Sequence, residues 1–388
     1  MRIGIFGGSF DPVHIEHVRL VESALRSLAL DKLIIVPACK PPHKQGKTLS
    51  ADSARLQACR LAFSGIEKAQ VSDFEILQGG TSYTYLTCRH FQEQYQGAQL
   101  FFIVGTDMLR DFPTWKNTDE ILKTVTLAVV ARAEQDGWLQ TERAKFKQKF
   151  NCDFAVVDYH GKDVSSTKIR VLAGAGEDVT PFVGDKVAAF IQEQGLYAVA
   201  GAKDALALEK PHRKEHSLRV AEVSAKKAVE LGIPEQKAIT AALFHDCGKN
   251  VKADSALLSG FDFDKYASVP SAVLHQFTGA YLAQTRFGVT DEEVLDAIKF
   301  HCSGKAEMST LAKIVYLADM VEDKRDFAGV ETLRKAFYEK GDLDKCLLLA
   351  LEQAIAHVKE KGGDMYPLTL QAYTYYKEKE YGKQTSIK

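Results

Sequence analysis

Short apolar runs alternate with helical patterns through the first half of the chain. The apolar runs cover residues 3–6, 32–37, 70–77, 100–105, 127–131 and 154–158. Between the first two runs, apolar residues recur with the spacing of a helix face, at Val18, Val21, Leu25 and Leu28. Strands that alternate with amphipathic helices form a parallel sheet with helices on both faces. We therefore predict a doubly wound α/β fold here, with ligands at the carboxyl ends of the strands.

The alternation ends after Tyr197, and the stretch 200–204 indicates a short linker. Beyond it the apolar residues follow a helical period over 217–231, 235–244, 272–286, 292–300, 311–320 and 344–358. This pattern predicts an all-α bundle. Because 388 residues exceed what one hydrophobic core normally organises, we expect two domains, an α/β domain at 1–200 and an all-α domain at 205–385.

Composition and net charge indicate which classes of partner to expect. With 46% hydrophobic and 26% charged residues the chain is typical of globular proteins, and its net charge of −1 gives no reason to expect nucleic acid or an anionic membrane. Seven cysteines without a Cys-x-x-Cys pair fit a reducing compartment. No signal pattern or apolar run of the ~20 residues of a membrane helix is present. We expect a cytoplasmic protein with small-molecule partners; a homo-oligomer is left open.

The first apolar run stops at Gly7-Gly8, and Ser9, Phe10, His14 and His17 follow. A glycine turn before a helix lets the backbone approach a ligand, and the helix N-terminus offers N–H donors to phosphate. A spacing of three places both imidazoles on one side of the helix. A plain turn with two polar residues explains the spacing equally well. Neither a P-loop nor a dinucleotide fingerprint is present.

Four further polar segments come after predicted strands. They are residues 37–44 with His43 and Lys44, residues 79–84 with Ser82, Tyr83 and Thr84, residues 106–116 with Asp107 and Trp115, and residues 165–170 with Ser166, Thr167 and Arg170. Hydroxyls and cations at helix starts suit an anion, whereas a carboxylate and a flat ring suit a ribose and a heterocycle. Each segment alone is also explained by a solvated loop or a helix cap.

These segments, in this order, resemble the nucleotidylyltransferases, whose signature is Gly-Gly-x-Phe-x-Pro-x-His-x-Gly-His, and in particular the bacterial nicotinate-nucleotide adenylyltransferases. The resemblance spans nearly all of residues 1–197 and implies adenylyl transfer from ATP, with Mg²⁺, to nicotinate mononucleotide. It implies a catalytic role for His14 and His17. The implied ATP and phosphate ligands are Gly7, Gly8, Ser9, Phe10, His43, Lys44, Ser166, Thr167 and Arg170, and the implied nicotinate-nucleotide ligands are Ser82, Tyr83, Thr84, Asp107 and Trp115.

One position departs from that signature, because Glu16 stands where the family usually has glycine. If its side chain crowds the phosphates, Glu16→Gly should lower the KM for ATP. The acceptor is also open at this point. Trp115 and residues 82–84 favour nicotinate mononucleotide, while nicotinamide mononucleotide and pantetheine phosphate are the alternatives.

The second half places His and Asp at unusual positions for a helical bundle. Five predicted helices carry such residues on or at the end of an apolar face, namely His216, His245 with Asp246, His275, His301 and Asp319. Any one of them is best explained as a hydrogen-bonded core residue. Their recurrence indicates a metal site instead, because imidazole and carboxylate suit Mg²⁺, Mn²⁺, Fe or Zn²⁺.

The order of these residues resembles the HD phosphohydrolases, and His275, His301 and the run 318–325 bring it close to the HD-type symmetrical bis(5′-nucleosyl)-tetraphosphatases, the YqeK family. The resemblance implies hydrolysis of diadenosine tetraphosphate to two ADP with a divalent metal, iron among the candidates. The implied metal ligands are His216, His245, Asp246 and Asp319; Lys249 is an implied catalytic cation, and His275, His301 and Arg325 would bind a second metal or polyphosphate. The alternative is a helical half that senses a nucleotide without turnover and regulates the transferase.

Overall fold

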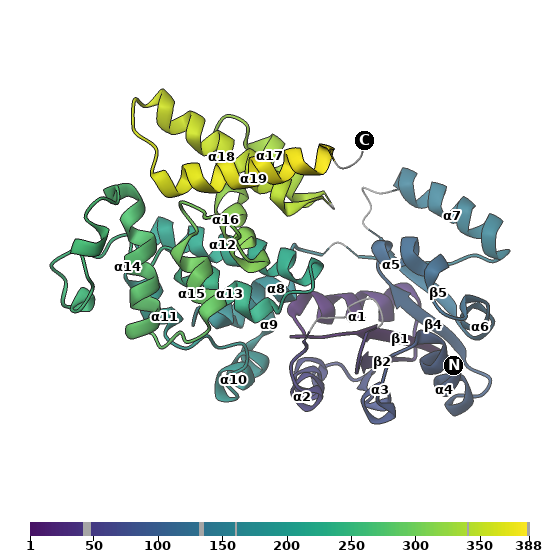
Figure 1. Ribbon diagram of the computed structural model, residues 1–388. Coiled ribbons are helices and arrows are strands. Elements are labelled where there is room, and N and C mark those ends of the chain that lie inside the picture. The colour runs from purple at the N-terminus through teal and green to yellow at the C-terminus, as the bar shows by residue number, and fades with distance from the viewer. Residues whose placement is uncertain (42–47, 132–135, 160, 340, 386–388) are drawn as a thin grey trace. The chain divides into compact units, whose positions relative to one another are not determined.

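The computed structural model describes residues 1–41, 48–131, 136–159, 161–339 and 341–385, which form two compact units (Figure 1). The first unit holds nearly all described residues up to Leu196, apart from 170–177. The second unit holds residues 170–177 and the chain from Tyr197 onward. The α/β pattern therefore belongs to the first unit and the helical pattern to the second.

A six-stranded parallel sheet with the order β3-β2-β1-β4-β5-β6 organises the first unit. Its strands are β1 (Arg2–Gly8), β2 (Lys32–Pro37), β3 (Ala69–Val71), β4 (Gln99–Val104), β5 (Thr126–Ala131) and β6 (Ala155–Asp158). The order reverses between β1 and β4, which is the switch point of a doubly wound sheet. The predicted fold class is confirmed.

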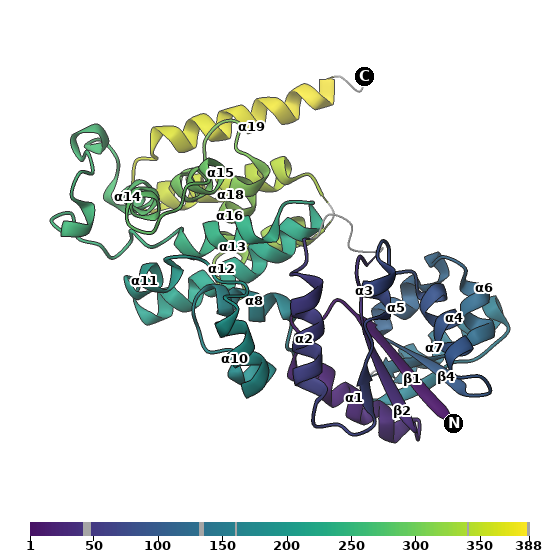
Figure 2. The same ribbon diagram turned by 90° about the horizontal axis from the view of Figure 1, so that it is seen from below.

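Helices cover both faces of this sheet. Figure 2 shows α1 and α2 on one side of the strands and α4 and α6 on the other. The helical elements of the first unit are α1 (Ile15–Ser27), α2 (Asp52–Phe63), α3 (Phe74–Gln78), α4 (Thr84–Gln94), α5 (Thr106–Asp111), η2 (Phe112–Thr114), α6 (Thr118–Thr124), α7 (Asp136–Phe150), α9 (Thr180–Val183) and α10 (Asp185–Glu193). Helix α8 (Ser166–Gly174) begins in the first unit and continues into the second from Arg170. Because both faces are covered, the consecutive residues Ile34 and Ile35 of β2, which point to opposite faces, are both buried.

The strand register brings the polar segments together at one edge. Gly7 and Gly8 lie opposite Val36 and Pro37, so β1 and β2 end side by side. On the other flank Ile5 lies opposite Phe102, so the end of β4 is also close. The segments that follow these strands therefore share the carboxyl edge of the sheet.

One predicted strand is wrong over most of its length. Residues 70–77 form a strand only as far as Val71, and α3 begins at Phe74. The helix is tied to a neighbouring element, because Thr87 on α4 donates a 2.5 Å hydrogen bond to the buried carboxylate of Glu75. Burial raises the pKa of Glu75, so this acid depends on that partner.

The second unit is helical throughout the part that the structure describes, as predicted. Its elements are α11 (Ala202–Ala207), α12 (Pro211–Glu230), α13 (Glu235–Phe244), η4 (Ala256–Leu258), η5 (Asp264–Tyr266), α14 (Ser271–Thr285), α15 (Glu292–Lys299), α16 (Thr310–Val321), α17 (Val330–Tyr338), α18 (Leu343–Glu360) and α19 (Pro367–Thr385). In Figure 1, α18 and α19 lie side by side. No helix among the described residues combines the length and hydropathy of a membrane span.

The expected linker at 200–204 is partly helical. Helix α11 begins at Ala202, directly after Gly201, whose φ of 74° is accessible to glycine at little cost. Ala202, Ala205 and Leu206 are buried in the core of the second unit. Apolar burial therefore converts a stretch that composition marks as a linker into the first helix of the bundle.

Candidate functional sites

The first site begins where β1 gives way to α1. His14 is the N-cap of α1, and its backbone N–H donates to Nδ1 of His17 over 3.1 Å. The two rings stack with centroids 3.6 Å apart, as their spacing predicts. Nδ1 of a neutral imidazole is an acceptor only when the proton is on Nε2, so a neutral His17 has its Nε2 as donor. That is the tautomer suited to a phosphate oxygen.

Burial sets the charge of His14. It lowers the pKa of the ring to about 4, although the nearby Glu16 carboxylate acts in the opposite direction. His14 is therefore a neutral hydrogen-bonding group near pH 7. The ring would bind phosphate as a dipole and not as a cation.

The turn before His14 is packed closely around Phe10. Phe10 has a φ of 47°, and a Cβ placed on Gly8 would come within 3.0 Å of its ring. Ser166 at the start of α8 donates to the carbonyl of Pro12 over 3.0 Å. This bond joins the hydroxyl segment after β6 to the histidine turn after β1.

The segment at 81–84 is fixed to the loop after β2. The N–H of Ser82 donates to the carbonyl of Lys40 over 3.0 Å, and the Ser82 hydroxyl accepts from the Cys39 N–H over 2.9 Å. Tyr83 precedes α4 and Thr84 begins it, and Lys116 Nζ lies 4.5 Å from the centre of the Tyr83 ring.

The remaining predicted nucleotide ligands are placed differently. Asp107 is exposed in the first turn of α5. Trp115 packs against Phe112 with ring centroids 5.3 Å apart. His43 and Lys44 lie outside the described residues. These roles stay predictions.

Glu16 does not point at the histidine rings. Its carboxylate accepts a 2.5 Å hydrogen bond from the Tyr159 hydroxyl and a 2.8 Å bond from the N–H of Lys162, and it pairs with Arg19 at 2.7 Å. Burial alone would raise the pKa of Glu16, but these three partners lower it. The carboxylate therefore ties α1 to the loop between β6 and α8, and the expected crowding of phosphate has no counterpart in this geometry.

Arg170 belongs to the second unit and is only 4% exposed. Its Nε donates to Glu235 over 3.0 Å, and a second guanidinium nitrogen bonds the other carboxylate oxygen at 2.5 Å. This two-point pair with a residue of α13 engages the guanidinium that was predicted to contact ATP. Phosphate binding by Arg170 stays a prediction.

The second site collects side chains from five places in the helical bundle. His216 comes from α12, His245 and Asp246 follow α13, His275 comes from α14, His301 follows α15, and Asp319 comes from α16. All four histidines and Asp246 are buried, with at most 6% exposed. The predicted cluster is therefore assembled in space.

Asp246 lies at the centre of the cluster, with its two oxygens facing different neighbours. Its Oδ1 atom lies 3.2 Å from Nε2 of His275 and 3.6 Å from Nε2 of His301. Its Oδ2 atom lies 3.5 Å from Nε2 of His245. On that flank His216 Nε2 is 2.8 Å from Asp319 Oδ1. One carboxylate thus adjoins two groups of imidazoles.

The rear nitrogens of three imidazoles are already occupied. Nδ1 of His245 donates to the carbonyl of Ala242 over 2.6 Å, and Nδ1 of His301 donates to the carbonyl of Ile298 over 2.7 Å. Nδ1 of His216 lies 3.0 Å from Glu322. Such contacts fix the tautomer that leaves Nε2 as a metal ligand.

The residues present fit a divalent cation. The buried Nε2 of His245 and Oδ1 of Asp246 have no hydrogen-bond partner among the described residues. Ligand atoms of His216, His245 and Asp246 lie within 4.8 Å of one another, as do those of His245, His301 and Asp319. Buried nitrogen and oxygen atoms that lack a hydrogen bond are suitable ligands for a metal ion of borderline hardness.

The two acids are held as carboxylates. Burial alone would raise the pKa of Asp246, but His245, His275 and His301 hold it well below its usual range. Burial likewise opposes ionisation of Asp319, whereas the hydrogen bond to His216 and the charge of Arg325 lower its pKa. Both oxygen ligands are therefore charged at neutral pH.

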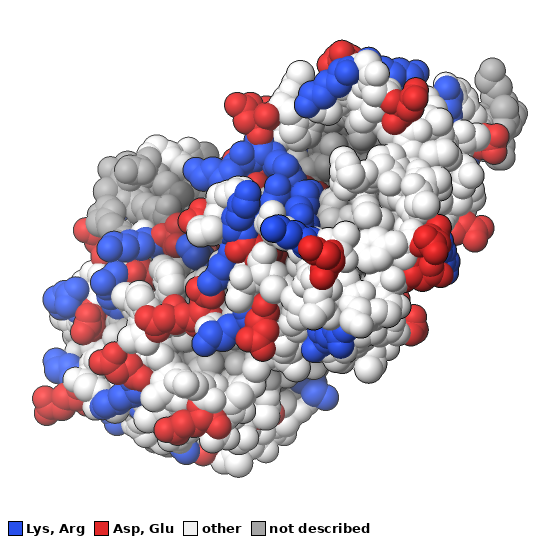
Figure 3. All heavy atoms as spheres, turned by 90° about the vertical axis from the view of Figure 1, so that its left-hand side faces the viewer, with Lys and Arg blue, Asp and Glu red and all other residues white. Residues whose placement is uncertain are grey.

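Cations lie around this cluster. Lys249 Nζ is 3.5 Å from Asp246 Oδ1, Arg325 Nη2 is 3.3 Å from His216 Nε2, and Arg213 is 2.8 Å from Asp246 Oδ2. Lys249 and Arg325 were predicted, whereas Arg213 and Glu322 were not. Each of those two lies three positions from a predicted ligand on a helix, which is the signal that would have found them. On the face drawn in Figure 3, one group of Lys and Arg residues lies close together, while Asp and Glu residues are interspersed over the rest of that face.

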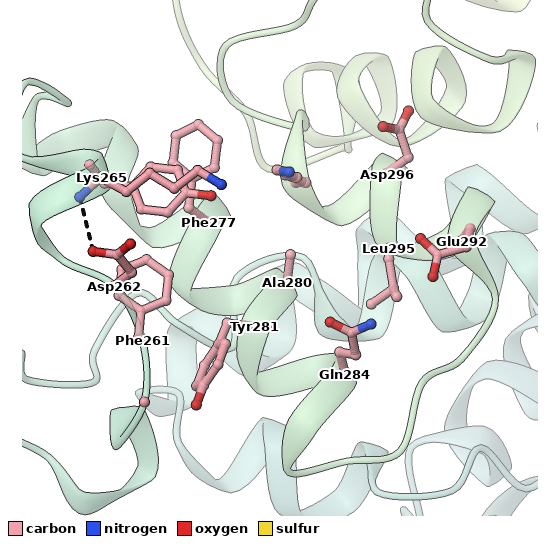
Figure 4. Close-up of a pocket in the computed structure, with 13 residues that line it drawn as sticks. Phe261, Asp262, Lys265, Phe277, Ala280, Tyr281, Gln284, Glu292, Leu295 and Asp296 are labelled. Atoms are coloured by element: carbon pink, nitrogen blue, oxygen red, sulfur yellow. Dashed lines mark hydrogen bonds between the residues drawn. The ribbon is translucent and has the colours of Figure 1, made fainter.

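A separate pocket of about 380 Å³ lies between α14, α15 and the segment before η5 (Figure 4). Its walls include the aromatic rings of Phe261, Phe277 and Tyr281, with Lys265 and Glu292 at the side. None of the described histidine or aspartate ligands of the second site lines it. We therefore assign the chemistry of this unit to the buried cluster and not to the pocket.

Comparisons with known proteins separate the same two halves. A cytidylyltransferase-like family model matches residues 5–172, and an HD domain model matches residues 213–324. The chain is 36% identical to a probable nicotinate-nucleotide adenylyltransferase of Clostridium tetani over 50% of this chain and 97% of that protein. It is 27% identical to a probable nicotinate-nucleotide adenylyltransferase/Ap4A hydrolase of Mycoplasma genitalium over 92% of this chain and 99% of that protein.

One similar solved structure, from Clostridium acetobutylicum, is described as a predicted HD superfamily hydrolase involved in NAD metabolism. Its sequence is 35% identical to this chain, the match covers 46% of this chain and 96% of that protein, and the TM-score is 0.43. The Clostridium tetani relative is matched along almost its whole length. Through its first half, the chain therefore belongs to the nicotinate-nucleotide adenylyltransferase family, and its second half contains an HD domain.

Proposed function

We propose that the first unit transfers the adenylyl group of ATP to nicotinate mononucleotide. A phosphate oxygen of the mononucleotide forms a bond to the α-phosphorus of ATP, and the bond from that phosphorus to the leaving pyrophosphate breaks. No protein nucleophile is needed, so the chain supplies positioning and hydrogen-bond donors. His14, His17 and Ser166 would provide them, with Mg²⁺ arriving on the triphosphate. The support is the turn that brings these residues to the edge of the sheet.

The second unit would hydrolyse diadenosine tetraphosphate to two ADP. An oxygen of water forms a bond to a phosphorus, the bridging bond on that phosphorus breaks, and ADP leaves with its electron pair while the water proton passes to solvent. His216, His245, Asp246 and Asp319 would hold a divalent ion, which would acidify the water and neutralise charge. Lys249 and Arg325 would hold the polyphosphate by charge-assisted hydrogen bonds.

One observation carries the hydrolase proposal. Ligand atoms of His216, His245 and Asp246 converge within 4.8 Å in a buried site, where a charge without partners is costly. A structural role would satisfy these atoms with hydrogen bonds, yet Nε2 of His245 has no such partner among the residues described. The full-length similarity to the Mycoplasma genitalium protein supports the pairing of the two activities in one chain.

Two variants of the full-length chain test both halves at once. Both reactions are followed by separating nucleotide products, with nicotinate and nicotinamide mononucleotides compared as acceptors. His17→Ala should lower adenylyl transfer about 10²-fold or more and leave hydrolysis unchanged. Asp246→Ala should abolish hydrolysis and reduce the bound divalent ion while transfer continues. Hydrolysis at the wild-type rate in Asp246→Ala contradicts the assignment, and nucleotide binding without turnover by the wild type favours a regulatory helical unit.

A further inference from the structure

Cys302 stands directly after His301, on the side of the cluster that holds His275. Ligand atoms of His275, His301 and Cys302 lie within 4.8 Å of one another. The thiol makes no hydrogen bond within the described chain.

The backbone beneath this thiol is held in place. Gln276, which is 0% exposed, accepts from the N–H of Cys302 over 3.2 Å and from the N–H of Ser303 over 3.0 Å. The same amide donates to the Ser303 hydroxyl over 2.9 Å. Gln276 neighbours His275 on α14, so one buried side chain fixes residue 302 relative to that imidazole.

A second observation points to a ligand at the same place. The buried Oδ1 atom of Asp246, which has no hydrogen-bond partner among the described residues, lies on the side of His275 and His301. Nε2 of His275 and Nε2 of His301 are 3.2 Å apart. Two imidazole nitrogens, a thiol and a buried carboxylate oxygen are therefore grouped here, with Lys249 Nζ 3.3 Å from Nε2 of His275 and 3.5 Å from Oδ1 of Asp246.

We propose that Cys302 is a thiolate ligand of a second metal ion, which it binds together with His275 and His301. The proposal rests on the metal-dependent hydrolase function proposed above and adds a sulfur ligand to it. As the sulfur–metal bond forms, the thiol proton passes to solvent and no electron is transferred. A thiolate favours Zn²⁺, Fe²⁺ and Co²⁺ over Mg²⁺ and Mn²⁺, so this position should discriminate among metals.

The test uses Co²⁺ on the metal-free, full-length protein, because a thiolate bound to Co²⁺ adds a near-ultraviolet charge-transfer band that nitrogen and oxygen ligands lack. The wild type should develop the band during titration, and Cys302→Ser should lose it together with one equivalent of tightly bound Co²⁺. Cys302→Ala repeats the measurement without a hydroxyl. Cys346→Ala, which removes a buried thiol of the same unit from α18, is the matched control and should keep the band.

The two possible failures are distinct. An unchanged band and unchanged Co²⁺ stoichiometry in Cys302→Ser overturn the thiolate ligand and leave the proposed hydrolase intact. Wild-type hydrolysis that continues without any divalent ion overturns the proposed hydrolase itself. His216→Ala separates the two positions, since it should weaken the first metal and retain the thiolate band.

Discussion

Glu322 lies behind His216, with its Oε1 atom 3.0 Å from Nδ1 of the imidazole, while Asp319 Oδ1 lies 2.8 Å from Nε2. Glu322 is 2% exposed and also accepts from Arg219 over 2.6 Å. Burial alone would raise the pKa of Glu322, but its bonds to His216 and Arg219 lower it. A carboxylate in this position orients a metal ligand and increases its basicity.

We expect Glu322→Gln to weaken divalent metal binding about 10–100-fold, because the rear contact of His216 loses its charge. Equilibrium dialysis with metal analysis measures the affinity directly. Glu331→Gln is the control, since that side chain is 80% exposed and pairs only at the surface with Arg334. Equal metal affinity in the Glu322→Gln and wild-type proteins would remove Glu322 from the site.

Glu16 should act as a positioning residue for the transferase. Glu16→Ala removes the acceptor for Tyr159 and Lys162, so the loop that leads to Ser166 loses its tie to α1. We expect a higher KM for ATP, the opposite of the effect that crowding would give. Steady-state kinetics at varied ATP concentration measure this KM. Glu16→Gln should partly restore the wild-type KM, and Glu22→Ala, which changes an exposed residue of α1, is the control. A lower KM in Glu16→Ala would restore the crowding hypothesis.

The buried pair of Arg170 and Glu235 should contribute to the stability of the second unit. Removing one partner leaves the other charge buried, which costs about 3–5 kcal/mol in the free energy of unfolding. We expect this loss in Arg170→Met and in Glu235→Leu, with partial recovery in the double variant. Unfolding followed by far-ultraviolet circular dichroism measures it. An Arg170→Met protein of normal stability with a raised KM for ATP would instead support the phosphate role.

Low pH should reduce the stability of the first unit, because His14 is buried in its neutral form. Its pKa is about 4 in the folded state against an ordinary value of 6.5, so between these values the unfolded chain binds the extra proton. Stability should therefore fall as pH drops from 6.5 toward 4, by up to about 1.4 kcal/mol per pH unit.

Tryptophan fluorescence isolates this unit, because Trp115 and Trp138 are the two tryptophans of the chain and both lie in it. Urea unfolding of the wild type at several pH values should show the free energy of unfolding falling between pH 6.5 and 4. In His14→Asn this dependence on pH should be weaker. An unchanged slope in that variant would show that other groups carry the acid sensitivity.

Local sequence pattern determined the order of the strands and of the six helices predicted for the second half. The apolar period alone predicts α13 at its observed bounds, 235–244, and β2 at 32–37, because a helix face or a buried strand requires that period wherever it packs. The ligand types were also readable, since His216, His245, Asp246 and Asp319 stand at apolar positions where polar groups need a partner.

Tertiary contacts decided what those residues touch. Glu75, in the segment predicted as a strand, accepts a hydrogen bond from Thr87. Arg170 pairs with Glu235, and Glu16 accepts from Tyr159 across 143 positions of sequence. A single sequence does not encode such pairings as a local period, because they depend on which faces meet after folding. For the same reason the spacing of Cys302 from His275 revealed nothing, and only the packing of α14 against α15 brought thiol and imidazole together.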